Sequence, residues 1–474
     1  MKPITRCFAW MLGGSLVLTG CTVGPHYEKP VLAAPAAWKA TAHEPSQVTR
    51  AIPAAWWSLF GDPDLDRVVA QVLAANHDLE QAAARVTEAR ALARMSAADR
   101  LPQVALDATH TQTRVSGTQA EPVGRGFSTR THSAQLGFDY EIDFWGRVRR
   151  SVEAAVADAE ARQHLHDTAA LLLTAEAGRA YWQIRSLDAE TTVLDATLAL
   201  RRDAVRLQAT RHEAGLINQV DVTRARTELA SVEAELHALR RERDRTEHAL
   251  AVLCGEAPAT FTLPANRAAL VWPEIPSGLP SDLLERRPDL AAAERELAAS
   301  TARIGVAKAE FFPRISLTGF AGFASADLNA LTRCDNRTGA IGPGLHLPLF
   351  DHGRNSAHLV ASEARQAQAL AAYRAAVLSA FREVEDALSD LGSLGEQRAA
   401  VERALVASRD TVALATERYQ KGLSNYLDVV DAQRVALQTE RLAVQLDGQR
   451  SLATVDLAKA LGGGWSAIAT TASP

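Results

Sequence analysis

The chain has 474 residues, a formal net charge of −5 at pH 7 and 5% aromatic residues. This mild acidity excludes a nucleic-acid binder that depends on a basic surface, and the abundance of Ala, Leu, Glu and Arg is typical of long, closely packed helices. The 13 His and 4 Cys residues show no metal-ligand spacing. No phosphate-binding loop or nucleophile motif is present, so we expect no metal, no cofactor, no catalytic residue and no enzyme.

Residues 1–20 have the pattern of a signal peptide, with Lys2 and Arg6 before an apolar core at 8–18. The tetrapeptide Leu18-Thr19-Gly20-Cys21 resembles a bacterial lipobox, which implies that Cys21 carries the N-terminal lipid and that the chain goes to the outer membrane. The alternative is an ordinary signal peptide in which the cysteine occurs by chance. No later stretch has the ~18 apolar residues that a spanning helix requires, so any membrane crossing would be made by strands.

The remaining chain contains an internal duplication. Residues 21–61 are rich in Pro and Ala and predict an extended segment. A helical pattern then runs from Asp64 to about Arg100, interrupted near Asn76, and the motif around Asp78-Leu79 recurs at Asp289-Leu290. Each copy reads as helix, two strands, long helix, tip and helix. We therefore divide the chain into repeat 1 at 62–270, repeat 2 at 271–461 and a tail at 462–474.

Four stretches alternate between apolar and polar residues and predict strands, at about 103–114, 131–144, 314–324 and 338–350. In the second stretch the polar face carries Asp139, Glu141 and Asp143, which would face an aqueous lumen. The pattern is typical of outer-membrane strands, and the alternative is a sheet on a soluble core. Four strands cannot close a barrel, so several chains must each contribute four.

Two long helical stretches follow the strand pairs, running to about His212 and about Gln420. The first shows a coiled-coil seam, with apolar residues at a seven-residue spacing. Each ends in a predicted hairpin tip, at 213–219 and 420–426. Gly215 and Gly422 suit a left-handed position after a helix. An Asn then follows that can cap the return helix, with Asp221 or Asp428 at its third position.

The chain resembles the TolC/OprM-like outer membrane factors, specifically the lipidated NodT-type efflux subunits. The residues that carry this resemblance are the lipobox, Val23–Pro30, Trp57–Asp62, Arg287–Leu290, Phe311–Arg314, Phe350–Arg354 and Tyr419–Arg434. The resemblance implies a mainly α protein with membrane β structure. A homotrimer would form a 12-stranded β-barrel continued by a periplasmic α-helical barrel. The implied partners are a periplasmic membrane-fusion adaptor, an inner-membrane transporter of the RND or MFS type and outer-membrane lipid, without nucleic acid.

The resemblance also implies a passive, gated export duct whose periplasmic aperture is lined by carboxylates. Asp428 and Asp431 occupy the matching positions and share one helix face. For Asp428 the alternative is a capping role at the helix N-terminus, whereas capping does not explain Asp431. Arg434 could pair with Asp431 and hold the aperture shut. The alternative is an exposed pair within one helix, worth a few tenths of a kcal/mol.

By the same resemblance, Asp221 and Tyr419 belong to links that lock the closed state. One family lock has Arg where this chain has Ser424, which puts that bond in doubt. The pairs Gly215-Leu216 and Gly422-Leu423 would be the adaptor-docking tips, although turn geometry alone also requires the glycines.

A different class of protein, a lipid-anchored periplasmic coiled-coil adaptor or scaffold, should have one hairpin and no quartet of lipid-facing strands.

Trp145, at a strand end, fits an aromatic residue at the membrane–water interface. We expect Cys254 and Cys334 to be free thiols, because they lie in different halves of the chain.

Overall fold

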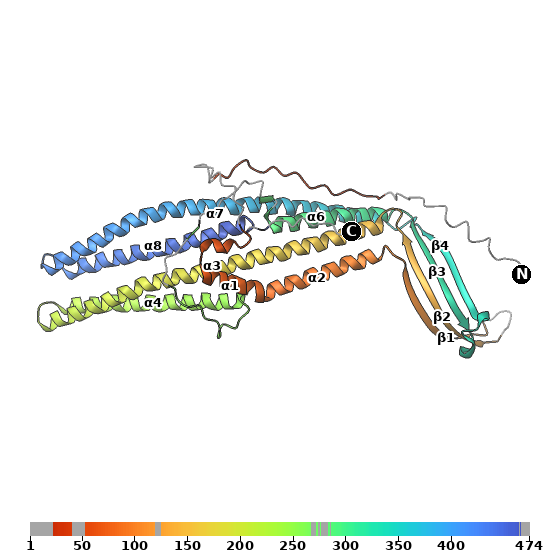
Figure 1. The fold of residues 1–474 in the computed structure, drawn as a ribbon, viewed down its shortest axis with the longest axis horizontal. Helices are drawn as coiled ribbons and strands as arrows, with labels where there is room; N and C mark the ends of the chain where they lie inside the picture. Colours follow the sequence, from red (N-terminus) through yellow and green to blue (C-terminus); the bar gives the residue numbers. More distant parts are fainter. Residues whose placement is uncertain are drawn as a thin grey trace. The chain divides into compact units, whose positions relative to one another are not determined.

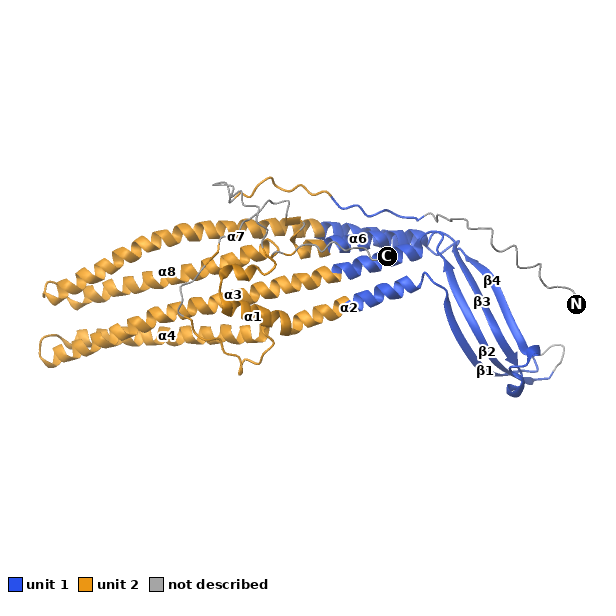
Figure 2. Ribbon diagram, in the orientation of Figure 1, with its two compact units in different colours: residues 1–30, 87–161, 293–372 blue, residues 31–86, 162–292, 373–474 orange. Residues whose placement is uncertain are grey.

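The computed structural model describes residues 22–39, 53–118, 125–266, 272–273, 275, 283–284, 286–463 and 465. The chain forms two compact units, each drawn in its own colour in Figure 2. Unit 1 comprises residues 1–30, 87–161 and 293–372, and unit 2 comprises 31–86, 162–292 and 373–474. Each unit therefore combines parts of both repeats. None of the described helices is long and apolar enough to span a membrane.

Helices make up most of the described chain (Figure 1). The α-helices are α1 (Pro63–Ala75), α2 (His77–Ala98), α3 (Arg147–Glu213), α4 (Gln219–Leu253), α6 (Pro288–Ala309), α7 (Arg354–Gln420) and α8 (Tyr426–Ala460), and the 3-10 helices are η1 (Trp56–Phe60), η2 (Leu328–Ala330) and η3 (Cys334–Asn336). Helices α3 and α7 have 67 residues each, and α4 and α8 have 35 each. These equal lengths confirm the internal duplication.

The interruption predicted near Asn76 lies between α1 and α2. The Asn76 side chain accepts hydrogen bonds from the backbone N–H groups of Asp78 and Leu79 and donates one to the Leu253 carbonyl at 2.9 Å. Asn76 thus caps α2 and ties it to the end of α4. At the start of α1, Asp62 is the N-cap and Pro63 the first helical residue, an arrangement suited to an N-terminus.

The four strands belong to unit 1 and form one antiparallel sheet in the order β1-β2-β3-β4. They are β1 (Gln103–Val115), β2 (Phe127–Ile142), β3 (Arg314–Ser325) and β4 (Arg337–His346). β1 and β4 are the two edges, so each has a single neighbour within the described chain. The strands curve together in Figure 1, and the ends of β2 and β4 that lead into α3 and α7 lie at the opposite end of the sheet from Phe127 and Arg337.

Two strand ends differ from the sequence prediction. β2 ends at Ile142, because the Asp143 carboxylate accepts hydrogen bonds from the backbone N–H groups of Val148 and Arg149 at 3.0 and 2.9 Å. Asp143 therefore caps α3, and the expectation that it continues the polar strand face is wrong. β4 ends at His346 rather than near residue 350, shortly before Pro348, which has no N–H group to donate to a ladder.

One hydrophobic cluster of unit 2 is built from the predicted coiled-coil seam. Leu187, Leu194 and Leu198 of α3 are buried against Val232, Leu236 and Leu239 of α4. These positions recur at heptad spacing on each helix, which lets the two helices pack along their length.

Candidate functional site

Both hairpin tips have the predicted helix-ending geometry. Gly215 and Gly422 each have φ of 70°, in the left-handed region that favours glycine. At the first tip the Leu216 N–H donates to the Arg211 carbonyl at 2.9 Å, and at the second the Leu423 N–H donates to the Arg418 carbonyl at 2.9 Å. These are Schellman closures, which satisfy the last helical carbonyls. The glycines are therefore required by the turns.

The return helices start with the predicted asparagine caps. The Asn218 side chain accepts from the Val220 N–H, and the Asn425 side chain accepts from the Asp428 N–H at 3.1 Å. The turns leave Leu216 and Leu423 at the ends of the hairpins with exposed fractions of 73% and 66%. Each tip thus exposes a large apolar side chain to solvent.

Asp428 and Asp431 lie exposed on one face of α8, while Val429 and Val430 between them are buried. Asp428 is at the third position of the capped helix, as predicted, so it can stabilise the helix start through the macrodipole. Asp431 lies beyond the cap, and its side chain is 58% exposed. The face of α8 opposite the packed core therefore carries two solvated carboxylates.

Arg434 forms the predicted ion pair with Asp431, at 3.6 Å, but its stronger partner is Glu228 of α4. The Arg434 side chain donates two hydrogen bonds to the same Glu228 oxygen, one of them at 3.0 Å from Nε. The Glu228 contact raises the pKa of Arg434. Arg434 thus links the return helices of the two repeats.

Glu228 is buried and also contacts Arg201 of α3 at 3.5 Å. Arg201 is buried and donates a hydrogen bond to the Gln433 side chain at 2.6 Å. Burial lowers the pKa of Arg201, and the charge of Glu228 opposes that effect. The sequence analysis does not predict a role for Glu228. The residue lies between Ala225 and Val232 on the apolar stripe of α4, and a carboxylate at such a position indicates a buried polar contact.

Tyr419, predicted as a gate link, bridges the two hairpins of one chain. Its hydroxyl donates to the Gln208 side chain at 3.1 Å, and the Arg211 guanidinium lies 5.1 Å from its ring centroid. Tyr419 also contacts Tyr426, with ring centroids 5.6 Å apart. Asp221, the other predicted link, lies 3.9 Å from Arg224 on its own helix. Asp221 therefore has only a weak partner within the described chain.

The tips also contain two buried hydroxyls, those of Ser424 and Tyr426, that have no hydrogen-bond partner in the described part of the chain. Burial raises the pKa of Tyr426.

On the sheet of unit 1, the predicted lumen residues differ in their surroundings. Asp139 is exposed, in register with Gln103 and Thr318, beside a depression of about 620 Å³ on the polar face. Glu141 is half-buried, pairs with Arg147 at 2.7 Å and lies 3.6 Å from Arg314. Asp139 thus remains a solvated acid, whereas Glu141 fastens the end of β2 to the start of α3.

Trp145 is partly buried at the helix-proximal end of the sheet, where it stacks on Phe312 with ring centroids 4.6 Å apart. Its indole N–H donates to the Pro313 carbonyl at 3.0 Å. Phe311, next to Phe312 in the sequence, and Phe350, shortly after the end of β4, are exposed. This end of the sheet therefore carries the mixture of aromatic rings and satisfied polar groups that occurs at membrane interfaces.

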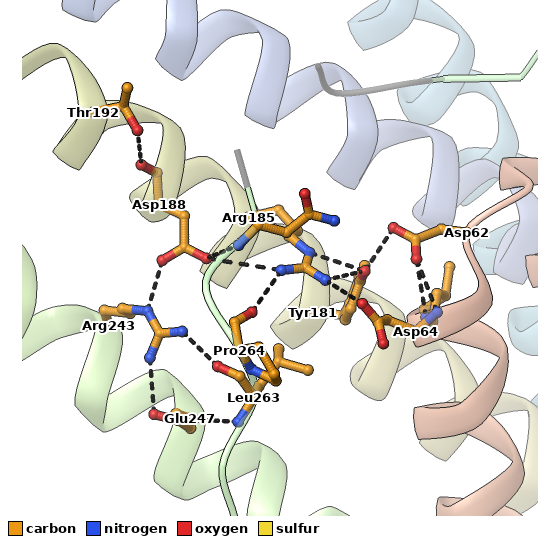
Figure 3. Close-up of polar contacts among 12 residues, drawn as sticks. Asp62, Asp64, Tyr181, Arg185, Asp188, Thr192, Arg243, Glu247, Leu263 and Pro264 are labelled. Carbon is orange, nitrogen blue, oxygen red and sulfur yellow. Dashed lines mark hydrogen bonds and ion pairs between the residues drawn. The ribbon is translucent and has the colours of Figure 1, made fainter. Parts of the chain in front are cut away.

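A buried polar network in unit 2 fixes α1, α3, α4 and the segment after α4 (Figure 3). Arg185 donates to the Tyr181 hydroxyl, the Asp64 carboxylate and the Pro264 carbonyl at 2.6, 3.0 and 3.0 Å. The Tyr181 hydroxyl in turn donates to Asp62 at 2.6 Å. Burial is the main cause that raises the pKa of Tyr181.

Arg243 completes the network. It contacts Asp188 at 2.6 Å, Glu247 at 2.9 Å and the Leu263 carbonyl at 2.8 Å. Because these groups come from distant parts of the chain, sequence reasoning did not find them. The network touches neither the tips nor the sheet, so its role is to hold the helices of unit 2 together.

Among the described residues, no group of three His, Cys, Asp or Glu side chains could hold a metal ion. Cys254 is buried and Cys334 is exposed, and both are free, as predicted. Cys21 and its lipid lie outside the described residues. Burial raises the pKa of the Cys254 thiol to about 11.

These environments predict different thiol reactivities. At pH 8 a maleimide should label Cys334 rapidly, whereas Cys254 should react only after unfolding, because the thiolate is the nucleophile. Mass spectrometry of labelled peptides measures both. The variant Cys334→Ser should lose the rapid label, and rapid labelling of Cys254 in the native protein would contradict the buried position.

Comparison with known proteins agrees with this geometry. The family model described as "Outer membrane efflux protein" matches residues 68–256 and 279–463, one segment in each repeat. The chain is 34% identical to outer membrane protein OprJ of Pseudomonas aeruginosa, over 95% of this chain and 94% of OprJ. It is 31% identical to the cation efflux system protein CusC of Escherichia coli, over 95% and 97% of the two chains.

Solved structures show the same fold. The outer-membrane channel OprN matches with a TM-score of 0.88 and 35% identity, covering 94% of this chain and all of OprN. The open-state MtrE channel of Neisseria gonorrhoeae matches with a TM-score of 0.83 and 31% identity, covering 94% and 98%. These matches extend over both hairpins and the sheet, and the chain belongs to the outer membrane efflux protein family.

Proposed function

We propose that three copies of this outer-membrane efflux channel subunit join into a passive, gated export duct. The observation that carries the proposal is the open four-stranded sheet, whose edges β1 and β4 each have one neighbour in the described chain. Unpaired strand edges are not tolerated in lipid, so the edges must pair with those of other copies. Three copies give a 12-stranded barrel, an even number within the range of such proteins.

The hairpins of the three copies would form the periplasmic end of the duct. Asp428 and Asp431 would contribute six carboxylates around one axis, a ring that attracts cations and repels anions. The contacts of Tyr419 with Gln208 and of Arg434 with Glu228 would hold the two hairpins of each chain together in the closed state. Asp221, with only Arg224 nearby, is available for a link to the neighbouring copy.

The exposed tip residues Leu216 and Leu423 fit an apolar docking surface for a periplasmic membrane-fusion adaptor. An inner-membrane transporter of the RND or MFS type would supply the energy, so the chain itself carries out no chemistry. Related proteins bear names as different as cation efflux, toluene efflux and pyoverdine export. We therefore propose that the partners, rather than this chain, select the cargo. The lipid on Cys21 would add an anchor to the outer membrane.

The rival class, a periplasmic adaptor or scaffold, should have a single hairpin. Here two hairpins of equal length are present, together with a four-stranded sheet. This architecture favours the duct.

Planar-bilayer recordings test the aperture. The purified protein should give small, cation-preferring currents. Asp431→Ala should enlarge them, because the shorter side chain and the lost pair with Arg434 loosen the constriction, and it should weaken the cation preference, because it removes negative charge. The control Asp244→Ala removes an exposed carboxylate of α4 far from the tip and should change neither quantity. A protein that forms no pores would refute the proposed duct, and an unchanged preference in Asp431→Ala would remove Asp431 from the aperture.

A further inference from the structure

The strand register divides the side chains of the sheet into two faces of opposite character. One face contains the sheet's acidic residues Asp107, Asp139 and Glu141. We call the other the lipid face. Apart from Arg337 on its outermost rung, its helix-proximal part has only apolar residues, Gly, Pro and one Tyr, namely Val104, Leu106, Ala108, Ala134, Leu136, Phe138, Tyr140, Ile142, Ile315, Leu317, Gly319, Ala321, Phe323, Gly339, Ile341, Pro343 and Leu345.

The apolar part of the lipid face is about as tall as the apolar band of an outer-membrane barrel. From Ile142 to Ala134, β2 advances about 27 Å at ~3.4 Å per residue. With the usual strand tilt of roughly 40°, this length spans about 21 Å along the membrane normal, and outer-membrane barrels have an apolar band about 25 Å tall. The next rung toward the hairpin turns therefore lies at the outer edge of the band.

At that edge the lipid face carries basic side chains. His110 and His132 are opposite each other, with Nδ1 atoms 3.1 Å apart and ring centroids at 4.3 Å. Arg130 and Arg114 follow toward the turn, and Arg337 is one rung inside, opposite Phe323. We call these five residues the outer rim.

Within the described chain, no carboxylate neutralises the positive charge of the outer-rim arginines. Its three arginines are exposed, and no described residue forms an ion pair with them. No described strand places Asp or Glu on the lipid face, because all three sheet carboxylates are on the opposite one. An arginine on a lipid-facing surface costs roughly 2–4 kcal/mol at the midplane but little near the interface. The three rim arginines can therefore lie only at the depth of the lipid headgroups.

We propose that the outer rim is a binding site for the phosphate groups of a phosphorylated outer-leaflet lipid. Each strand is joined at one end to a helix of the periplasmic part, so its opposite end, where the outer rim lies, is at the outer leaflet. The apolar band below the rim accommodates the acyl chains. Guanidinium groups bind phosphate oxygens in a bidentate manner, and the imidazoles add hydrogen-bond donors. The inference rests on the proposed barrel, in which the lipid face points outward.

Native mass spectrometry of the complete protein in detergent tests the site, with diphosphoryl lipid A and chemically dephosphorylated lipid A as probes. The unmodified protein should bind the diphosphoryl form at least about tenfold more tightly, since one charged hydrogen bond contributes ~1.5–3 kcal/mol. Arg114→Gln/Arg130→Gln/Arg337→Gln should lose this preference. The matched control Arg85→Gln/Arg94→Gln/Arg374→Gln removes three exposed helix arginines and should keep it.

Equal binding of the two lipids by the unmodified protein would overturn the proposal, whether or not the variant inserts. A full preference in the rim variant would overturn it as well. Bilayer recordings distinguish a failure of the lipid-binding proposal from a failure of the proposed export duct. Intact currents without lipid preference reject the rim alone, whereas the absence of pores rejects the barrel on which the rim depends.

Discussion

Arg185→Ala should lower the free energy of unfolding by about 3–5 kcal/mol, the usual cost of removing one partner from a buried charge network. Arg185 is only 3% exposed and serves three acceptors from different segments. Without it, the Tyr181 hydroxyl and the Pro264 carbonyl lose their donor, and Asp188 keeps Arg243 alone as an ion-pair partner among the described residues. The denaturation midpoint of the detergent-solubilised protein measures the loss.

Arg240→Ala is the matched control for this change. Arg240 lies 3.7 Å from Asp195, and its side chain is 53% exposed. Exposed pairs of this kind contribute at most about 1 kcal/mol, so the control should remain close to the unmodified protein. Similar losses in the two variants would show that the network in Figure 3 does not fasten the helices of unit 2.

Glu228→Gln should open the duct. The substitution keeps the size of the side chain but removes the charge that holds Arg434 and faces the buried Arg201. Hydrogen bonds to charged groups contribute ~1.5–3 kcal/mol, so their loss should shift a closed-to-open equilibrium by about tenfold or more toward the open state. Open probability in single-channel recordings reports this shift.

Glu233→Gln controls for the loss of a carboxylate on the same helix, because Glu233 forms an exposed pair with Arg202 at 3.3 Å. Its open probability should match that of the unmodified protein. An unchanged open probability in Glu228→Gln would mean that the link between α4 and α8 contributes to packing and not to gating.

The parts of the fold that the sequence predicted depend on local chemistry. Gly215 and Gly422 end helices because they adopt positive φ, and Asn218 and Asn425 start helices because their side chains accept backbone N–H groups. Both signals are visible within a few residues. The strands were also predictable from the alternation of apolar and polar residues, because side chains on successive residues of a strand point to opposite faces.

The errors and omissions come from contacts between distant segments. The end of β2 was misplaced because Asp143 fits the alternating pattern but caps α3. Arg434 was expected to pair with Asp431 on its own helix, and its second partner Glu228 comes from the other repeat. In the sequence, this ion pair is indicated only by the position of Glu228 on the apolar stripe of α4. That position does not identify Arg434 as the partner.

The outer rim illustrates an intermediate case. The arginines and histidines are visible in the sequence, but only the strand register shows that Arg114, Arg130 and Arg337 share a face free of described carboxylates. Register depends on how the two hairpins pair with each other, which no local pattern specifies.

The central claim is that one chain supplies a third of a closed membrane cylinder. Native mass spectrometry of the protein extracted from outer membranes tests it most directly. The account predicts a complex of three chains that dissociates only on denaturation. A stable, water-soluble single chain would contradict it, because the strand edges and the apolar sheet face would then have no other copy to cover them.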